Sequence, residues 1–169
     1  MTAATPALRS RLASNQDKGI TRQLVTFVLA GEEYALDIKK VQEIILNNTP
    51  TFIPQSPAFI RGLINLRGNV IPVVDLRTLF GMPTVEATAD TRIIVVESRG
   101  VIVGLTVDAV NEVLRIGEKQ LSPAPPTVAN LGRRYLAGLV QLDKRLVILL
   151  NGDELLATDD LQRLDQDAN

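Results

Sequence analysis

The sequence predicts a mostly β fold made of two small, similar lobes, and two observations lead to this expectation. The first is a series of short runs rich in β-branched and aromatic residues, separated by glycine, proline and asparagine. The second is a degenerate tandem repeat that gives both halves of the chain the same order of runs. Short antiparallel strands at this spacing favour small barrels, because closing a sheet removes its exposed edges. We therefore expect about five strands in each lobe.

The first half is predicted to form two hairpins joined by a short helix. Its strands are expected at 23–29, 34–36, 63–66 and 70–74. The apolar spacing from Ile38 to Leu46 is helical, and Asp37 can cap the first turn. Between the last two strands lies Arg67-Gly68-Asn69, where Gly-Asn is a turn signal because both residues tolerate positive φ. This predicts a tight hairpin with Arg67 at its tip, and Asp75 then precedes a second helical pattern.

The second half is predicted to repeat this unit beyond a polar boundary at 83–90. Its strands are expected at 92–97, 101–107, 110–116, 135–142 and 146–150. A C-terminal helix is expected from Asp153 to Leu164 at most, with Leu155, Leu156 and Leu161 packed onto a lobe. The expected domain is therefore 20–157, with lobes at about 20–82 and 90–157. A flexible leader at 1–19 precedes it, and the end of the helix and a tail at 158–169 follow.

The repeat becomes visible when the two halves are laid over one another. A shift of 69 matches Gly31 with Gly100, Leu36 with Leu105, Val41 with Val110 and Glu43 with Glu112. A seven-residue insertion makes the shift 76, which pairs Gly62 with Gly138, Val70 with Leu146 and Asp75 with Asn151. Two of the differences bear on the first hairpin: Arg67 matches Asp143, and Pro72 matches Ile148. Because proline cannot donate to a ladder, Pro72 is expected on an edge or at a bulge, which places its hairpin at the rim of a sheet.

The composition excludes several kinds of chemistry. The 169 residues contain no histidine and no cysteine, so no imidazole base, catalytic triad, thiolate nucleophile or disulfide can form. The net charge of −1 provides no global field for nucleic acid or an anionic membrane. The longest apolar runs are about as long as a strand, far below the roughly 20 residues that span a bilayer. No metal site or membrane insertion is expected.

The candidate functional residues lie at the first hairpin and on one repeated element. Arg67 could be a solvated turn residue, or its planar fork could dock a partner's carboxylate or carbonyl groups. Arg61 has a weaker claim of the same kind. The repeated segments 41–44 and 110–113 could be core, or they could line the junction of the lobes as an apolar groove for a partner helix. The following residues are expected to be caps or turn residues: Asp37, Asp75, Asp108 and Asn151.

Three segments resemble one known family. They are Gln42-Glu43-Ile44, the stretch from Phe59 to Leu76 that contains Asn-Leu-Arg-Gly and Pro-Val-Val-Asp-Leu, and Val107-Asp108-Ala109-Val110. This pattern resembles the CheW-like domain family of bacterial chemotaxis coupling proteins, over about residues 22–157. The resemblance implies two SH3-like five-stranded barrels around a shared core, no catalysis and no cofactor.

The resemblance also implies partners and a binding site. Family members bridge the cytoplasmic helical-hairpin tips of chemoreceptors to the regulatory domain of the histidine kinase CheA, and CheW-like domains alternate in rings at receptor arrays. The implied location is the cytoplasm, with recruitment to those arrays. The family's receptor contacts lie between the lobes and carry over to Val41, Glu43, Ile44, Arg67, Gly104, Val110 and Val113. No kinase-facing residue is assigned.

Other functions stay open at this point. A regulatory module in a different kinase pathway would have the same features, and its co-purifying proteins would distinguish it. An enzyme that uses carboxylates alone would need two of them about 5 to 10 Å apart in one pocket. Binding of nucleic acid is disfavoured, because only 4% of the residues are aromatic and no basic stripe is present.

Overall fold

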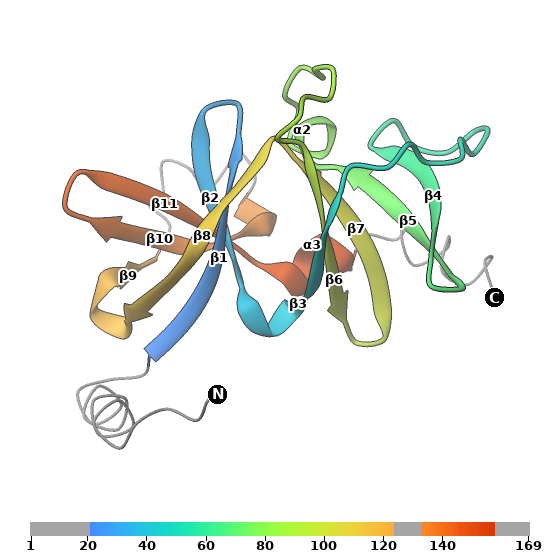
Figure 1. The fold of residues 1–169 in the computed structure, drawn as a ribbon. Coiled ribbons are helices and arrows are strands. Elements are labelled where there is room, and N and C mark those ends of the chain that lie inside the picture. Colours follow the sequence, from blue (N-terminus) through green and yellow to red (C-terminus); the bar gives the residue numbers. More distant parts are fainter. Residues whose placement is uncertain (1–20, 124–132, 158–169) are drawn as a thin grey trace.

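The computed structural model describes residues 21–123 and 133–157, and strands dominate this part of the chain (Figure 1). The predicted leader at 1–19 and tail at 158–169, with Leu161, lie outside the described residues. The strands are β1 (Thr21–Leu29), β2 (Glu32–Asp37), β3 (Val41–Leu46), β4 (Ile60–Leu66), β5 (Asn69–Asp75), β6 (Arg92–Ser98), β7 (Val101–Val107), β8 (Ala109–Gly117), β9 (Leu121–Ser122), β10 (Leu136–Leu142) and β11 (Arg145–Leu150). The short helices are η1 (Ile38–Lys40), α2 (Leu76–Leu79), η2 (Glu118–Gln120), η4 (Arg133–Tyr135) and α3 (Gly152–Leu156). The predicted mostly β fold is confirmed.

The predicted helix from Ile38 to Leu46 is wrong. Only η1 is helical there, and Asp37 caps it by accepting a hydrogen bond from the Lys39 amide. The residues that follow form β3, in which half-buried and exposed residues alternate. A short run of Val and Ile is compatible with either period, and β-branched side chains favour the strand once a neighbouring sheet is available.

Two sheets are formed, and each takes strands from both halves of the sequence (Figure 1). The five-stranded sheet has the order β3-β6-β7-β5-β4, and the six-stranded sheet has the order β8-β1-β2-β11-β10-β9. In the described chain β3 pairs with β6 of the other half, and its repeat mate β8 pairs with β1. The expected lobe boundaries at 20–82 and 90–157 therefore do not coincide with the sheets. A repeat reveals the order of strands along the chain but not which strands pair.

The repeat itself is reproduced in detail by the sheet register. Gln42 in β3 and Asn111 in β8 are repeat mates, and both are skipped in the pairing with the neighbouring strand. The register also shifts at equivalent places in β4, after Ile60, and in β10, after Leu136. Gly62 and Gly138 follow these shifts. A Cβ atom on Gly62 would stand 2.2 Å from the Thr51 carbonyl oxygen, and one on Gly138 would stand 2.7 Å from the Ser122 carbonyl oxygen. Both positions therefore require glycine for the same reason.

The first hairpin lies at the rim of its sheet, as predicted, because β4 is an edge strand. Its turn consists of Arg67 (φ 53°) and Gly68 (φ 87°), whereas Asn69 already belongs to β5. The turn is therefore Arg-Gly rather than Gly-Asn. Asn65 supports it by accepting a hydrogen bond from the Gly68 amide at 2.8 Å. Positive φ is uncommon for an arginine and occurs here within the tight turn.

Pro72 explains a difference between the two repeats. β5 has neighbours on both sides, so Pro72 does not lie on an edge strand, and no register shift occurs at it. The parallel pairing of β5 with β7 begins only at Val73. In the second repeat the corresponding parallel pairing of β11 with β2 already includes Ile148, opposite Tyr34. The missing amide of Pro72 thus coincides with a parallel ladder that begins one residue later in the first repeat.

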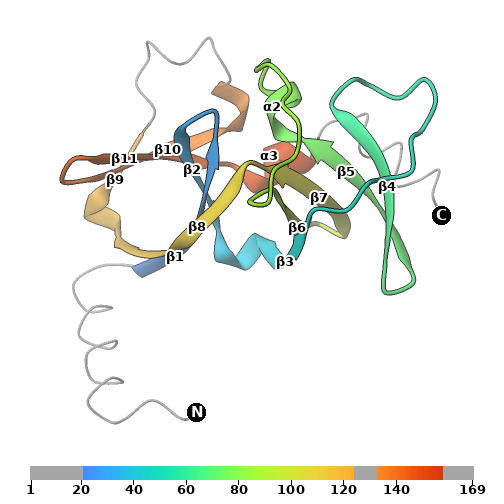
Figure 2. The same ribbon diagram turned by 45° about the horizontal axis from the view of Figure 1, so that its top comes forward.

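Three buried clusters make up the core. One cluster lies within the six-stranded sheet, around Leu24, Val140 and Val147. A second lies within the five-stranded sheet, around Ile64, Ile71 and Ile93, which are the repeat mates of those residues. The third and largest cluster joins both sheets, from Phe27 to Leu156, and includes Leu155 of α3 as predicted. Asn151 caps α3, which lies between the two sheets in both ribbon views (Figures 1 and 2).

Candidate protein-interaction surface

Strands β3 and β8 carry most of the predicted site. We call them the exchanged strands, because each pairs with a strand from the other half of the sequence. Val41 and Val110 are half-buried repeat mates that pack against the central cluster between the sheets. Ile44 and Val113 are also repeat mates, but their side chains are 41% and 54% exposed. Val41 and Val110 therefore anchor their strands in the shared core. Three residues further along each strand, an aliphatic side chain is exposed to solvent. The predicted equivalence of 41–44 and 110–113 is confirmed by the register.

Arg67 and Glu43, predicted separately, are brought together by the fold. The two guanidinium nitrogens of Arg67 each donate to a different carboxylate oxygen of Glu43, both at 2.6 Å. The hydrogen bond from Arg67 lowers the pKa of the Glu43 carboxyl, and that from Glu43 raises the pKa of Arg67. The Arg67 side chain stays 73% exposed. Its fork is therefore positioned by a carboxylate of its own chain while remaining open to a partner.

This ion pair also shapes the five-stranded sheet. Glu43 lies on β3 and Arg67 follows β4, and these strands are the two edges of that sheet. Arg61 of β4 makes a second connection, because it donates to the side chain of Asn47 just after β3. The sheet must therefore curl until its edges approach each other. The pairing of Thr51 with Leu63 covers part of the β4 edge in addition.

The second lobe contains a counterpart that the sequence reading missed. Arg145 at the start of β11 donates to Glu33, with Nε at 2.6 Å, and also contacts Glu112 at 2.8 Å. Glu112 is the repeat mate of Glu43. The arginine has moved two positions along the hairpin relative to Arg67, since Arg145 corresponds to Asn69. A search for any basic residue near the second turn, rather than at the matched position, would have found it.

The electrostatics of this second pair are stronger. The side-chain hydrogen bond from Arg145 is the main cause that lowers the pKa of Glu33 from 4.5 to about 2. Burial opposes this shift but does not cancel it. The same hydrogen bond raises the pKa of Arg145. The exposed fraction of the Arg145 side chain is 33%, so this arginine is held between two carboxylates rather than offered to solvent.

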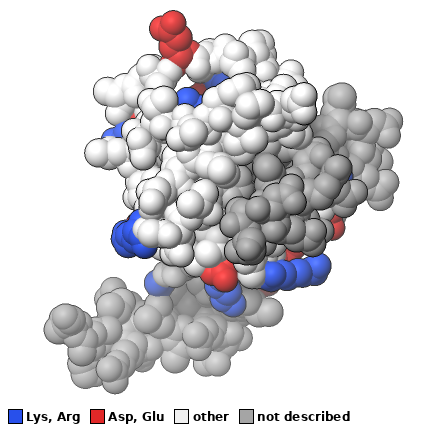
Figure 3. Space-filling view, turned by 90° about the vertical axis from the view of Figure 1, so that its right-hand side faces the viewer, with Lys and Arg blue, Asp and Glu red and all other residues white. Residues whose placement is uncertain are grey.

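Exposed aliphatic side chains beside these ion pairs also recur in both lobes. Val70 and Leu146 are repeat mates at the two hairpins, 51% and 54% exposed. Each sheet thus carries an arginine–glutamate pair and two exposed aliphatic residues, one from β3 or β8 and one from the hairpin. The glutamate and the aliphatic residue that follows it in β3 or β8 point to opposite faces of the strand. The face over β4 and β5 is largely uncharged where the described residues form it (Figure 3). Apolar surface flanked by a fixed ion pair is suited to protein contacts.

Gly104 does not lie on this surface. It is buried in β7, and a Cβ atom there would stand 2.8 Å from Cγ2 of Ile93. The residue lies opposite Val73 and Val95, so its lack of a side chain lets three strands pack closely. Gly104 therefore acts on the shape of the sheet and offers no side chain to a partner.

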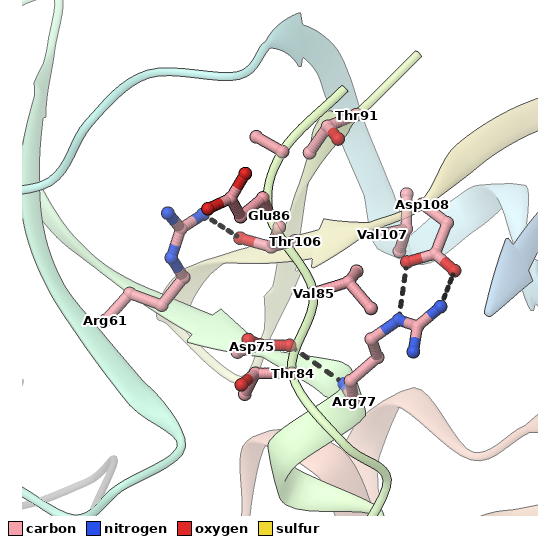
Figure 4. Close-up of a pocket in the computed structure, with 11 residues that line it drawn as sticks. Arg61, Asp75, Arg77, Thr84, Val85, Glu86, Thr91, Thr106, Val107 and Asp108 are labelled. Atoms are coloured by element: carbon pink, nitrogen blue, oxygen red, sulfur yellow. Dashed lines mark hydrogen bonds and ion pairs between the residues drawn. The ribbon is translucent and has the colours of Figure 1, made fainter. Parts of the chain in front are cut away.

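A pocket of about 270 Å³ lies at the other end of the five-stranded sheet (Figure 4). Arg77 of α2 donates to both carboxylate oxygens of Asp108, at 2.8 and 2.6 Å. Asp108 also accepts from the Ala30 amide, so it binds the β1–β2 turn. The hydrogen bond from Arg77 lowers the pKa of Asp108. Asp75 accepts from the Arg77 amide and caps α2, as predicted.

Among the carboxylates of this pocket, Asp108 is not placed to act as a general acid. The pocket contains Asp75, Glu86 and Asp108. A general acid needs a raised pKa, whereas that of Asp108 is lowered and its two oxygens are held by Arg77. In residues 21–123 and 133–157 no group of three or more acidic side chains could hold a metal ion. The same residues contain no helix long and apolar enough to span a membrane.

The fold and this surface define a module for protein–protein contacts, and the comparisons identify its family. The family described as CheW-like domain matches residues 23–160. The chain is 37% identical over 146 residues to a chemotaxis protein CheW of Klebsiella aerogenes, covering 86% of this chain and 88% of the relative. It is 36% identical over 136 residues to a probable chemotaxis protein CheW of Rhizobium etli, covering 80% and 88%.

A solved structure agrees with both. The crystal structure of the scaffolding protein TtCheW from Thermoanaerobacter tengcongensis matches with a TM-score of 0.77 at 39% identity. The match covers 83% of this chain and 96% of that chain. The chain therefore belongs to the CheW-like domain family, and the resemblance found in its motifs is confirmed.

Proposed function

We propose that this chain is a non-catalytic adaptor of chemotaxis that couples chemoreceptor tips to the histidine kinase CheA and takes part in array assembly. Its relatives are named chemotaxis proteins CheW, and the matched structure is titled a scaffolding protein. The partners would be the cytoplasmic helical hairpin of a receptor, the regulatory domain of CheA and further copies in rings. The protein would act in the cytoplasm and be recruited to arrays at the membrane. No cofactor is required.

The observation that carries the proposal is the recurrence of one surface on two exchanged strands. Ile44 and Val113 expose aliphatic side chains at equivalent points of β3 and β8. Val41 and Val110, three residues before them, fix these strands to the core shared by both sheets. A receptor helix with aliphatic residues at helical spacing would contact such side chains. The receptor-binding residues proposed are Val41, Glu43, Ile44, Arg67, Val110 and Val113, with Gly104 supporting them from within β7.

Arg67 has a defined role in this proposal. Its guanidinium is oriented by Glu43 but remains mostly exposed, so little conformational entropy is lost when a partner binds it. A carbonyl or carboxylate of the receptor would bind the donors that Glu43 leaves unused. The pair would supply a polar contact at the edge of β3, while Ile44 would supply apolar contact from the opposite face of the same strand.

The test is a pull-down or titration with receptor tips. Arg67→Glu is expected to weaken binding at least tenfold, because two carboxylates would then face each other at the surface. The thermal midpoint should change by less than about 2 °C, since exposed ion pairs contribute little to stability. Arg99→Glu is a matched control, because Arg99 (φ 52°) also precedes a glycine in a hairpin turn. It should bind like the wild type.

A charge swap distinguishes direct contact of the receptor with Arg67 from an indirect role of the ion pair in positioning β3. Arg67→Glu combined with Glu43→Arg restores an ion pair with opposite polarity. If the receptor contacts the Arg67 fork, the swap stays defective; if the pair only positions β3, binding returns. Unchanged binding of Arg67→Glu would remove Arg67 from the site. Failure of the wild-type chain to form a ternary complex with a receptor tip and a CheA regulatory domain would refute the coupling function as a whole.

A further inference from the structure

The pocket beside α2 contains one arginine that its own chain leaves largely unused. Arg77 is fully engaged: it donates to both oxygens of Asp108 and to the Pro83 carbonyl. Arg61 differs, because its only partners in the described chain are the side chains of Thr106 at 3.3 Å and Asn47 at 3.4 Å. Both are neutral, and both contacts are long for hydrogen bonds. No carboxylate in the described residues lies within ion-pair distance of Arg61.

The position of Arg61 is set by a β-bulge in β4. Its neighbours Ile60 and Gly62 pair with adjacent residues of β5, so Arg61 is the extra residue of a β-bulge. A bulge re-aims the side chain that it carries. The second repeat has the same bulge but places Ala137 there. In Figure 4 the Arg61 side chain points into the pocket, on the side opposite to Arg77. The second repeat therefore has no arginine at the corresponding point.

A surface segment passes over this pocket and carries a carboxylate toward Arg61. Thr84, Val85, Glu86 and Ala87 line the pocket, and all four are exposed. The segment is fixed at both ends, by the bond from Arg77 to the Pro83 carbonyl and by the bond from the Thr88 amide to Thr91. Glu86 lies on the Arg61 side of the pocket in Figure 4. Glu86 is therefore an internal candidate to pair with Arg61.

We propose that this pocket binds a carboxylate carried on a short aliphatic stem, with Arg61 as the binding group and Glu86 as an internal competitor. The guanidinium would accept the carboxylate in a bidentate arrangement. Val85 and Val107, which also line the pocket, would contact the stem. A volume of about 270 Å³ lies just below the range of roughly 300 to 1,000 Å³ for drug-sized ligands, so it suits a glutamate side chain or a small dicarboxylate.

Glu86 would compete with an external carboxylate for Arg61. When the Glu86 carboxylate pairs with Arg61, the pocket is occupied, and the apparent affinity for any other carboxylate falls with the fraction of open molecules. Removing this charge should therefore tighten binding without adding a contact. The inference concerns residues outside the proposed receptor surface and does not rest on the proposed function.

The experiment is an NMR titration of the whole chain, in which the Nε–Hε resonance of Arg61 is followed. Two probes distinguish the source of the carboxylate: glutarate, and a blocked tripeptide with a central glutamate. We expect saturable shifts of the Arg61 resonance at millimolar concentrations. A response to glutarate alone assigns the pocket to a small molecule, and a response to both probes assigns it to an acidic side chain of a partner. Glutaramide, which lacks the charge, should cause no shift.

Variants make the inference falsifiable. Glu86→Gln should lower the apparent dissociation constant for the carboxylate roughly two- to tenfold. Arg61→Gln should abolish the saturable shifts of neighbouring backbone amides, such as that of Thr106. Arg99→Gln, which removes an exposed arginine outside the pocket, should leave the titration unchanged. The proposal is overturned if neither probe gives a saturable shift, if glutaramide acts like glutarate, or if Glu86→Gln does not tighten binding.

Discussion

The hairpins at 60–75 and 136–150 arose from one repeat but hold their arginines in different ways. Arg67 sits in the turn itself, pairs with Glu43 and is 73% exposed. Arg145 begins the returning strand, contacts Glu33 and Glu112 and is 33% exposed. Each hairpin thus contacts β3 or β8 through an arginine–glutamate pair, but the arginine stands two positions further along in the second repeat. From this difference in exposure we expect the first pair to serve binding and the second to serve stability.

The largest expected effect concerns the glycines at the bases of the two hairpins. Gly62→Ala should lower the free energy of unfolding by about 3 kcal/mol or more, because its Cβ would overlap the Thr51 carbonyl and its φ of +146° disfavours alanine. Gly138→Ala should cost about 1 to 3 kcal/mol, since its Cβ would stand 2.7 Å from the Ser122 carbonyl oxygen and 3.1 Å from Leu121, but its φ is not positive. Urea unfolding measures both. Gly117→Ala, with no atom within 4 Å of its Cβ, is the control. Equal losses in all three variants would refute the steric explanation.

The next largest effect is expected when the residue types at the equivalent positions 72 and 148 are exchanged. Ile148→Pro should cost about 3 kcal/mol, because Ile148 pairs with Leu139 on one side and Tyr34 on the other. Pro72→Ile should change stability by less than about 1 kcal/mol, since the β5–β7 ladder begins only after it. Denaturant unfolding gives both values. If Pro72→Ile were as damaging as Ile148→Pro, the proline would have a role other than ending the ladder.

A smaller effect is expected at the partly buried ion pair of Arg145 and Glu33. Arg145→Ala should lower the free energy of unfolding at neutral pH by about 1 to 2 kcal/mol, because it leaves Glu33, whose side chain is 14% exposed, without its main partner. Lys144→Ala is a suitable control, since Lys144 adjoins Arg145 in the sequence and makes no hydrogen bond or ion pair to Glu33 or Glu112 in the described residues. A loss as large in the control would point to the turn rather than the ion pair.

The pH dependence of that loss checks its cause. The pKa of Glu33 is lowered from 4.5 to about 2 in the folded chain, so the unfolded state binds the proton more readily. The stabilisation is therefore complete above about pH 5 and disappears as the pH falls toward 2. The difference between wild type and Arg145→Ala should shrink over this window. A difference that is constant from pH 7 to pH 2 would exclude the Glu33 charge as its source.

Much of this architecture could be predicted from the sequence, and the failures have physical causes. The strands, the repeat, the caps Asp37, Asp75 and Asn151 and the rim position of the first hairpin all follow from local patterns. The exchange of β3 and β8 could not be predicted, because pairing between distant strands leaves no local signal. The helix expected from Ile38 to Leu46 failed because sheet formation overrides the spacing of a short apolar run.

The candidate site divides in the same way. Motif positions located Glu43, Ile44, Arg67 and Val113 on exposed or accessible elements, but the pairing of Arg67 with Glu43 required two opposite edges of a sheet to meet. Gly104 was taken for a contact residue, although its role is to admit Ile93. Arg145 was missed because the matched position in the second turn is Asp143. A repeat comparison by position cannot detect a contact rebuilt two residues away.

The smallest expected effect tests whether the position of the arginine or the contact itself matters. Arg67→Ala combined with Asn69→Arg transfers the arginine of the first hairpin to the position that Arg145 has in the second. The new arginine should still reach Glu43, as Arg145 reaches Glu112, so the thermal midpoint should stay within about 2 °C of the wild type. Receptor binding should nevertheless fall, because the fork would leave the turn and lie along the strand. If binding were retained, the ion pair with the exchanged strand would be what both lobes require, and the turn position of Arg67 would be incidental.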